Sequence, residues 1–330
     1  MDTATHAAVG VGLAGLSHID PVVAADPKLA VAVFIGTVAG SQAPDLDTLL
    51  RLKSNALYIR HHRGISHSIP AIVLWTILIS CAAAAITDTE YLGHLLLWTF
   101  IAVCIHVWQD LFNAYGTQAL APFYRRWIAW NIIHIFDPFI FTAHLVTILL
   151  WILHVQPPQI LFTCLYIIIV CYYIWRTAAR ACLKHKLLRS DPDLKPQDRY
   201  DLFPTYKIGV WNVIKTRAGE ASFRIGEWKK RRFIWVDELR CQRHPAIEAS
   251  KELEDVQALL NLTDFACPKC IEHDWGYEVR WTDIRYLHRK QYPFVAIALF
   301  DHELQPLNSY VGWLSDEKLE KKLRLKPQER

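Results

Sequence analysis

Long apolar stretches, all within the first 180 residues, constrain this chain of 330 residues more than any other feature. Residues 1–180 hold 18 Asp, Glu, Lys and Arg side chains, whereas residues 181–330 hold 50. This division excludes a uniform soluble globule and a disordered chain. It predicts a membrane domain over residues 1–180, a basic juxtamembrane linker over 181–199 and a small soluble α+β domain over 200–330.

Six apolar segments predict an all-α polytopic membrane domain of about six helices. They cover residues 7–18, 29–43, 69–87, 93–112, 133–154 and 159–177. The last four approach the length that crosses about 30 Å of hydrocarbon. The first two are short and rich in Gly and Ala, so they are either short spans or a re-entrant pair packed closely against the others.

Basic residues are distributed unevenly between the two sides of this topology. One side receives residues 44–68, residues 113–132 and the chain from the end of the last segment onward, and up to Arg189 it carries eleven Lys and Arg residues. The other side carries only Lys28. By the positive-inside rule, the basic side is cytoplasmic. We therefore expect a multi-pass protein of the cell membrane with a cytoplasmic C-terminal domain.

Side chains that bind divalent metals occur at the ends of the apolar segments, and the topology places these ends on one face. The candidate ligands are His6, Asp45, Asp47, His62, His67, His106 and Asp110. Imidazole and carboxylate groups together bind zinc, manganese or iron. His106 and Asp110 are four residues apart, so both project from one face of a helix. We predict a centre for one or two divalent ions, with zinc preferred and some of these residues supporting the ligands.

The same residue types predict a hydrolytic reaction. A two-metal centre activates a water and stabilises the attacking and leaving oxygens of a phosphoryl group. Asp47, His67 and Arg63 are the candidate catalytic residues, and Arg63 would hold a phosphate through paired hydrogen bonds. A site at the membrane favours a membrane lipid or lipid-linked phosphoester as substrate. Ser66 and Ser68 are expected to support the site, because no Ser–His–acid arrangement is evident.

Four motifs, in this order, resemble the YdjM-type family of bacterial membrane-bound metal-dependent hydrolases. They are Met1-Asp2-x-x-Thr5-His6, Pro44-Asp45-x-Asp47, His62-Arg63-Gly64-Ile65-Ser66-His67-Ser68 and His106-x-x-x-Asp110. The resemblance covers about residues 1–140 and implies a hydrolase without naming its substrate. More distantly, the pattern is similar to zinc-dependent phospholipase C, in which His and Asp on helices hold a metal cluster. The N-terminal Trp of those enzymes is absent here.

Two other classes of function fit these residues. Intramembrane His and Asp also line ion pathways, as in a divalent-metal transporter. A pathway needs polar groups through the whole membrane depth, whereas these gather at one face. A noncatalytic membrane anchor or regulator would instead hold a structural metal and lose its fold when the metal is removed.

The C-terminal half reads as alternating strands and helices. Apolar alternation predicts antiparallel strands around the Ala218-Gly219 turn and a strand over 293–300. Helical spacing predicts helices over about 245–261 and 315–325. Two cysteines of this half, Cys267 and Cys270, are either reduced residues in a turn or zinc ligands together with Cys241, His244 and His273. The basic run at 228–233 favours a solvated strand edge over contact with anionic headgroups, and no nucleic-acid partner is expected.

Overall fold

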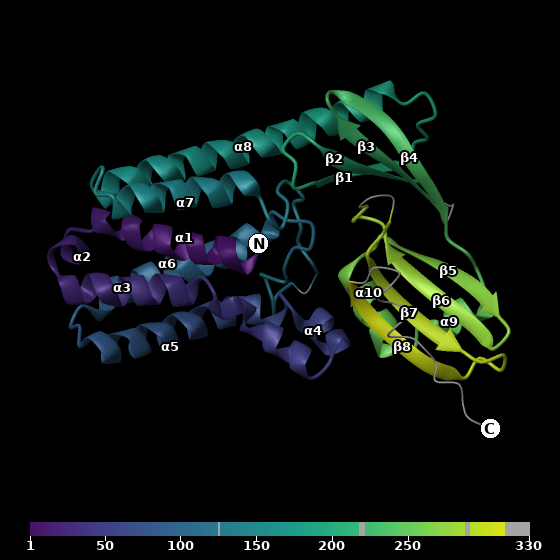
Figure 1. Ribbon diagram of the computed structural model, residues 1–330, viewed down its shortest axis with the longest axis horizontal. Coiled ribbons are helices and arrows are strands. Elements are labelled where there is room, and N and C mark those ends of the chain that lie inside the picture. Colours follow the sequence, from purple (N-terminus) through teal and green to yellow (C-terminus); the bar gives the residue numbers. More distant parts are fainter. Residues whose placement is uncertain (125, 218–221, 288–290, 314–330) are drawn as a thin grey trace. The chain divides into compact units, whose positions relative to one another are not determined.

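The protein forms two compact units in the computed structural model, which describes residues 1–124, 126–217, 222–287 and 291–313 (Figure 1). The first unit is mainly helical and holds Met1–Thr48, His62–Arg189 and Phe203–Ile208. The second unit holds Leu49–His61, Ser190–Leu202 and the described residues from Gly209 onward. The segment 49–61 therefore leaves the helical unit, joins the second unit and returns to the first at His62.

Six longer helices build the first unit, and capping residues determine where several of them begin. The helices are α1 (Thr3–Leu16), α3 (Pro27–Gly40), α5 (Ile69–Thr87), α6 (Leu92–Leu111), α7 (Pro138–Ile152) and α8 (Pro158–Ser190). Asp2, Asp26 and Asp137 are the N-caps of α1, α3 and α7, and each side chain accepts a hydrogen bond from a backbone N–H. Shorter helices connect them: η1 (Ser17–Ile19), α2 (Pro21–Ala25), η2 (Ala43–Leu52) and η3 (Ile65–His67).

Fewer helices are long enough to span a membrane than the six apolar segments predicted. Over the described residues, α5, α6 and α8 qualify by length and hydropathy, with 19, 20 and 33 residues. Helices α3 and η2 add a fourth candidate if the pair, bent by 45°, counts as one span. α1 has 14 residues and α7 has 15, which at about 1.5 Å per residue gives only about 21–23 Å. Six complete spans are therefore not confirmed, because two of the helices are shorter than the hydrocarbon is thick.

Glycines allow α1, α3 and α6 to approach one another closely. A Cβ atom at Gly10 of α1 would collide with the Ser41 side chain at the end of α3 and would lie 2.9 Å from the carbonyl oxygen of Thr37. A Cβ atom at Gly36 of α3 would collide with the Thr99 side chain of α6. Small residues thus bring backbones together, which is their usual role in membrane bundles. The close approach places the C-terminal end of α3 beside α6.

Two four-stranded sheets dominate the C-terminal half. The first has the order β1-β2-β3-β4, with β1 (Arg199–Pro204), β2 (Trp211–Thr216), β3 (Ser222–Lys229) and β4 (Arg232–Arg240). The second has the order β5-β6-β7-β8, with β5 (Ala266–His273), β6 (Gly276–Asp283), β7 (Phe294–Phe300) and β8 (Pro306–Trp313). Strands β2 to β4 pair antiparallel, and so do β5 to β8. The predicted α+β character of this half is confirmed.

Individual elements of this half match the sequence predictions to different degrees. Strands β2 and β3 pair as expected, and β7 corresponds to the strand predicted over 293–300. The helix predicted over 245–261 is instead two helices, α9 (Pro245–Ser250) and α10 (Glu254–Leu262). Leu253 has an extended backbone between them, which interrupts the helical hydrogen bonds. The turn at 218–219 and the charged helix predicted over 315–325 lie outside the described residues.

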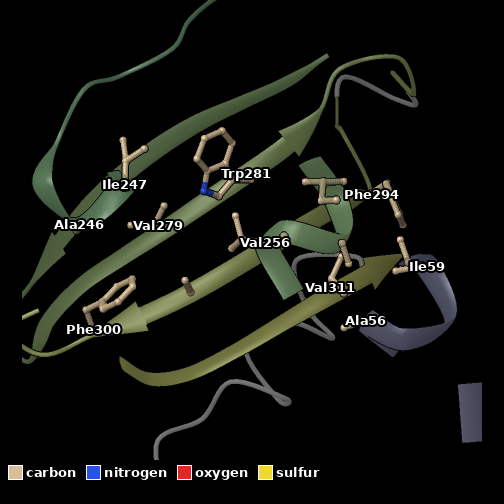
Figure 2. Close-up of a cluster of buried hydrophobic side chains, with 14 residues drawn as sticks. Ala56, Ile59, Ala246, Ile247, Val256, Val279, Trp281, Phe294, Phe300 and Val311 are labelled. Atoms are coloured by element: carbon tan, nitrogen blue, oxygen red, sulfur yellow. The ribbon is translucent and has the colours of Figure 1, made fainter. Parts of the chain in front are cut away.

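The core of the second unit includes residues that are distant in the sequence. Helix α4 (Asn55–His61) contributes Ala56 and Ile59, which are 6% and 8% exposed. They join one buried cluster with residues of α10 and β8, including Val256 and Val311 (Figure 2). Burying one such large aliphatic side chain stabilises a fold by roughly 1.5–3 kcal/mol. Although α4 lies within the predicted membrane domain by sequence, its apolar face is thus part of the α/β core.

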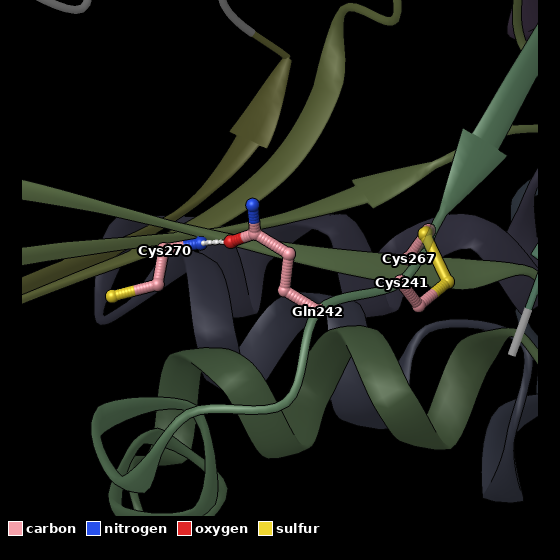
Figure 3. Close-up of a disulfide and its surroundings, with 4 residues drawn as sticks. All are labelled: Cys241, Gln242, Cys267 and Cys270. Atoms are coloured by element: carbon pink, nitrogen blue, oxygen red, sulfur yellow. Dashed lines mark hydrogen bonds between the residues drawn. A yellow bond between two sulfur atoms is a disulfide. The ribbon is translucent and has the colours of Figure 1, made fainter.

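Cys267 and Cys270 both lie on strand β5 and not in a turn, and of the two Cys270 alone is a free cysteine. Cys267 forms a disulfide with Cys241 (Figure 3). Residues three apart on a strand point to opposite faces, so this pair cannot bind one ion together. The backbone N–H of Cys270 donates to Oε1 of Gln242 at 2.7 Å. The Cys270 sulfur lies 3.5 Å from Nδ1 of His244.

Candidate metal centre

The helix ends of the first unit bring the predicted ligands to one place. His6 lies in the first turn of α1, and both Asp45 and Asp47 lie in η2. The loop from His62 leads into η3, which ends at His67. The last turns of α6 supply the remaining pair, His106 and Asp110. Segments separated by up to about a hundred residues therefore converge, as expected for ends that share one face of a bundle.

Four residues form the buried ligand set, which consists of Asp45, His67, His106 and Asp110. One candidate ligand atom from each lies within 4.8 Å of all the others. The side chains of His67, His106 and Asp110 are fully buried, and that of Asp45 is 13% exposed. A shell of this kind, with two imidazoles and two carboxylates, matches the ligands that zinc takes in proteins.

The distances from the two imidazole nitrogens to each other and to the two carboxylate oxygens are close to those of a tetrahedron around one ion. The two Nε2 atoms of His67 and His106 are 3.2 Å apart. Asp45 Oδ1 lies 3.6 Å from each Nε2 atom, and Asp110 Oδ2 lies 3.4 Å and 3.8 Å from them. A tetrahedral zinc ion with ligands at about 2.0–2.1 Å requires separations of about 3.3–3.4 Å. The residues present therefore fit a divalent ion without large movements.

Hydrogen bonds to the far side of each imidazole determine which nitrogen faces the centre. His106 Nδ1 lies 2.7 Å from the carbonyl oxygen of Ser41, which can only accept, so Nδ1 carries the proton. Ser66 Oγ donates to Asp47 Oδ2 at 2.6 Å and lies 2.9 Å from His67 Nδ1, which therefore donates to it. Both Nε2 atoms then present lone pairs toward each other. A cation between them would remove this repulsion, and such outer hydrogen bonds are typical of metal-binding histidines.

Burial keeps one of these imidazoles in the form that binds metal. It lowers the pKa of His67 well below its usual value, and the neighbouring His106 lowers it further. A neutral imidazole is the form required of a metal ligand. The Oδ1 atom of Asp45 and the Oδ2 atom of Asp110 are buried and take part in no hydrogen bond within the described residues. Two buried carboxylate oxygens beside two unprotonated imidazole nitrogens are the kind of donor set that a divalent cation takes, and Asp110 Oδ2 also contacts Arg63 Nε.

Three residues form the outer ligand set, which consists of Asp45, Asp47 and His62. Their candidate ligand atoms also lie within 4.8 Å of one another. His62 Nδ1 is 2.7 Å from Asp47 Oδ1, and their side chains are 21% and 8% exposed. Asp47 Oδ2 also accepts from the backbone N–H of Arg63 at 3.0 Å. Because Asp45 belongs to both sets, two ions could share its carboxylate.

His6 lies beside the buried ligand set without being one of its four members. Its ring stacks on that of His106 with a centroid separation of 3.8 Å. Its Nε2 atom is 3.4 Å from Asp110 Oδ1 and 2.8 Å from the amino group of Met1. The Met1 amino group also contacts Asp110 Oδ1. The structure thus brings six of the seven predicted ligands into the two sets and places His6 in contact with two of them.

Arg63 points its guanidinium group into the protein. It has a φ of 62° and is 4% exposed. Its Nε atom is 3.1 Å from Asp110 Oδ2, while Nη1 donates to Asn113 Oδ1 at 3.1 Å and Nη2 to the Met1 carbonyl oxygen at 3.2 Å. These contacts orient Asp110. Its role in holding a phosphate remains a prediction, and a phosphate would have to share these donors.

Sequence reasoning missed two groups that support the site. Asn113 is fully buried and donates through Nδ2 to Asp110 Oδ1 at 3.2 Å. Its position three residues after Asp110 is a signal that could have been used, because such residues are neighbours at a helix end. The carbonyl oxygen of Ser41 holds His106, and a backbone group leaves no signature in a sequence.

Comparisons with known proteins agree with the motifs. The family model of the YdjM inner membrane protein matches residues 1–183, and the YfhP C-terminal alpha/beta plait domain matches residues 245–323. The uncharacterized protein YfhP of Bacillus subtilis (strain 168) is 41% identical over 329 residues, which cover 98% of this chain and 99% of that protein. No solved structure matches the chain. The first match spans more than half of the chain and includes every candidate ligand, so the chain belongs to the YdjM inner membrane protein family.

Proposed function

We propose that this protein is an integral membrane metal-dependent hydrolase that cleaves a phosphoester of a lipid or a lipid-linked substrate. The observation that carries the proposal is the buried ligand set, whose four facing atoms are spaced as a tetrahedral zinc site requires. Family membership supports the membrane location and carries no information about the reaction. Zinc is the proposed ion, and manganese or iron are the alternatives for the same residues.

The arrangement of the two ligand sets supports phosphoryl chemistry. Bound divalent ions would supply an activated water and charge stabilisation for the phosphoryl oxygens. The shared carboxylate of Asp45 holds the two sets together. The Ser66 hydroxyl lies between His67 and Asp47, which are catalytic candidates. It donates a hydrogen bond to Asp47 and accepts one from His67. Arg63 keeps Asp110 directed at the centre.

Apolar side chains beside the ligands support a lipid substrate. Leu46 lies between the two aspartates of η2 and is 50% exposed. Ile65 lies in the histidine loop and is 74% exposed. Both are surrounded in sequence by residues whose side chains turn inward to the ligand sets. An acyl chain would bury these two residues while its phosphate approached the metal ligands, which a small soluble phosphoester could not do.

The uneven distribution of Lys and Arg supports a cytoplasmic position for the site and the C-terminal domain. Cys182 is exposed near the basic end of α8. An impermeant maleimide should therefore label Cys182 in inverted vesicles and not in intact cells, and the reverse pattern would place the site outside. Disulfides are rare in the cytoplasm, so the Cys241–Cys267 disulfide argues against this sidedness, and the labelling experiment decides between the two.

Metal content of the detergent-purified protein tests the centre itself. We expect bound zinc in the wild type and its loss in the His106→Ala/Asp110→Ala double variant. His144→Ala is the matched control, because His144 is also fully buried in the bundle but bonds to the carbonyl oxygen of Ile140. A folded wild type that takes up no zinc, manganese or iron would refute the centre.

Turnover tests the reaction. Zinc-loaded protein should hydrolyse a phospholipid in mixed micelles, and the double variant should not. A metal-loaded wild type without turnover on any lipid phosphoester would leave a structural metal, as in an anchor or regulator. Zinc accumulation inside proteoliposomes would instead favour a transporter.

A further inference from the structure

The segment between the two outer ligands belongs to the other unit of the protein. Asp47 and His62 contact each other at 2.7 Å, yet residues 49–61 between them are part of the second unit. The chain therefore passes from one ligand into the α/β unit and returns directly at the other ligand. Asp45 is the one member of the buried set in η2. Residues 48–61 contribute no ligand to the buried set.

Helix α4 is held in that unit by its apolar face. Ala56 and Ile59 are buried in one cluster with Val256 and Val311 (Figure 2). The side-chain amide of Asn55 also reaches the Tyr310 hydroxyl at 3.5 Å. Ile59 is only three residues before His62, which is less than one helical turn. A displacement of α4 from the core would therefore be transmitted to His62 over a very short length of chain.

The two ligand sets differ in what fixes them. His67, His106 and Asp110 are fully buried within the helical unit, and α6 carries two of them. His62 is 21% exposed and is attached to the end of α4. A change in the packing of α4 should thus move His62 and leave His67, His106 and Asp110 in place.

We propose that the α/β unit is a positioning module for the outer ligand set, and that Ile59 is the positioning residue through which it acts. The inference rests on the metal centre of the proposed function and adds a role for the C-terminal half. Whatever alters the packing around α4 would alter the second metal site, so the α/β unit could regulate the centre without contributing a ligand.

Zinc titration of the full-length protein in detergent tests this role. Ile59→Ala should weaken binding of the second zinc equivalent by about 10-fold or more, the size of effect seen when residues that orient metal ligands are changed. The first equivalent should bind as in the wild type. Ile247→Ala is the matched control, because Ile247 is 2% exposed in the same core but lies on α9, which leads to no ligand. It should leave both equivalents unchanged.

Equal effects of Ile59→Ala and Ile247→Ala on the second equivalent, or no effect of either, would overturn the proposal. If either alanine variant fails to fold, Ile59→Val and Ile247→Val make the same comparison with a smaller loss of volume. Hydrogen exchange of the Arg63 amide, which donates to Asp47 Oδ2, provides a second readout in metal-free protein, and this amide should exchange faster only in the Ile59 variants.

The exchange measurement separates this inference from the proposed function. If the wild type binds no metal but the Arg63 amide exchanges faster in the Ile59 variants alone, the metal centre is refuted and the coupling is supported. If the wild type binds two zinc ions and the Ile59 and Ile247 variants bind the second ion equally well, the centre is supported and the coupling is refuted.

Discussion

The buried and outer ligand sets share Asp45 but are built on different principles. The buried set is held by helix ends inside one unit, with each imidazole fixed by a hydrogen bond on its far side. The outer set depends on a loop and a helix that the other unit packs. Two neighbouring sites can thus depend on different parts of the fold. We therefore expect the buried set to bind its ion more tightly than the outer set.

Loss of the carboxylate that the two sets share should have the largest effect, because both sets would then lose their ion. Asp45→Ala removes one ligand from each set, so we expect loss of both zinc equivalents from the purified protein. The exposed Asp264 provides the control, and Asp264→Ala should retain both. Elemental analysis after gel filtration measures the stoichiometry. Retention of one equivalent in Asp45→Ala would show that the sets do not share this residue.

Loss of the hydroxyl between the sets should have an intermediate effect. Ser66→Ala removes the hydrogen-bond partner of His67 Nδ1 and a donor to Asp47. We expect about 10–100-fold weaker zinc binding at both sites, the usual cost of removing a group that orients metal ligands. Ser68→Ala is the control, since Ser68 Oγ donates to the carbonyl oxygen of Ile65 instead. Competition with a chelating dye measures both affinities, and equal values for the two variants would contradict the role of Ser66.

The smallest expected effect concerns the metal-free protein in acid. Burial lowers the pKa of His67, so below about pH 6.5 the unfolded chain binds a proton that the folded chain excludes. Stability should therefore fall as the pH drops below this value, by at most about 1.4 kcal/mol per pH unit from this group. Thermal unfolding in detergent with a chelator, at pH 7.5 and 5.5, should show a smaller decrease for His67→Gln than for the wild type. Equal decreases would mean that His67 does not carry this dependence.

The convergence of the ligands could be predicted because each one ends an apolar segment. Segment ends in a bundle are confined to two faces, so the predicted order of the segments was enough to place His67 near His106. Segment hydropathy does not show where a helix begins and ends. For this reason it did not predict that α1 and α7 are shorter than membrane spans. The sequence also gave no sign of the carbonyl oxygen that holds His106, since every residue carries one.

The partner of α4 could not be predicted for a different reason. Ala56 and Ile59 are three residues apart and indicate a helix with an apolar face, but a face does not specify what covers it. The covering residues, such as Val256 and Val311, are about two hundred positions away. In the same half, the spacing of Cys267 and Cys270 fitted either zinc ligands or reduced cysteines in a turn, because spacing alone does not distinguish a turn from a strand.

The close approach of α1 and α3 has a consequence for the protonation of a ligand. Gly10 leaves room for the Ser41 region, whose carbonyl oxygen keeps the proton of His106 on Nδ1. A methyl group at Gly10 would collide with the Ser41 side chain and with the backbone of Thr37 and Val38, so the end of α3 that carries the Ser41 carbonyl would have to shift. The tautomer of His106 is thus set by the smallness of a residue on another helix, which itself touches no ligand atom.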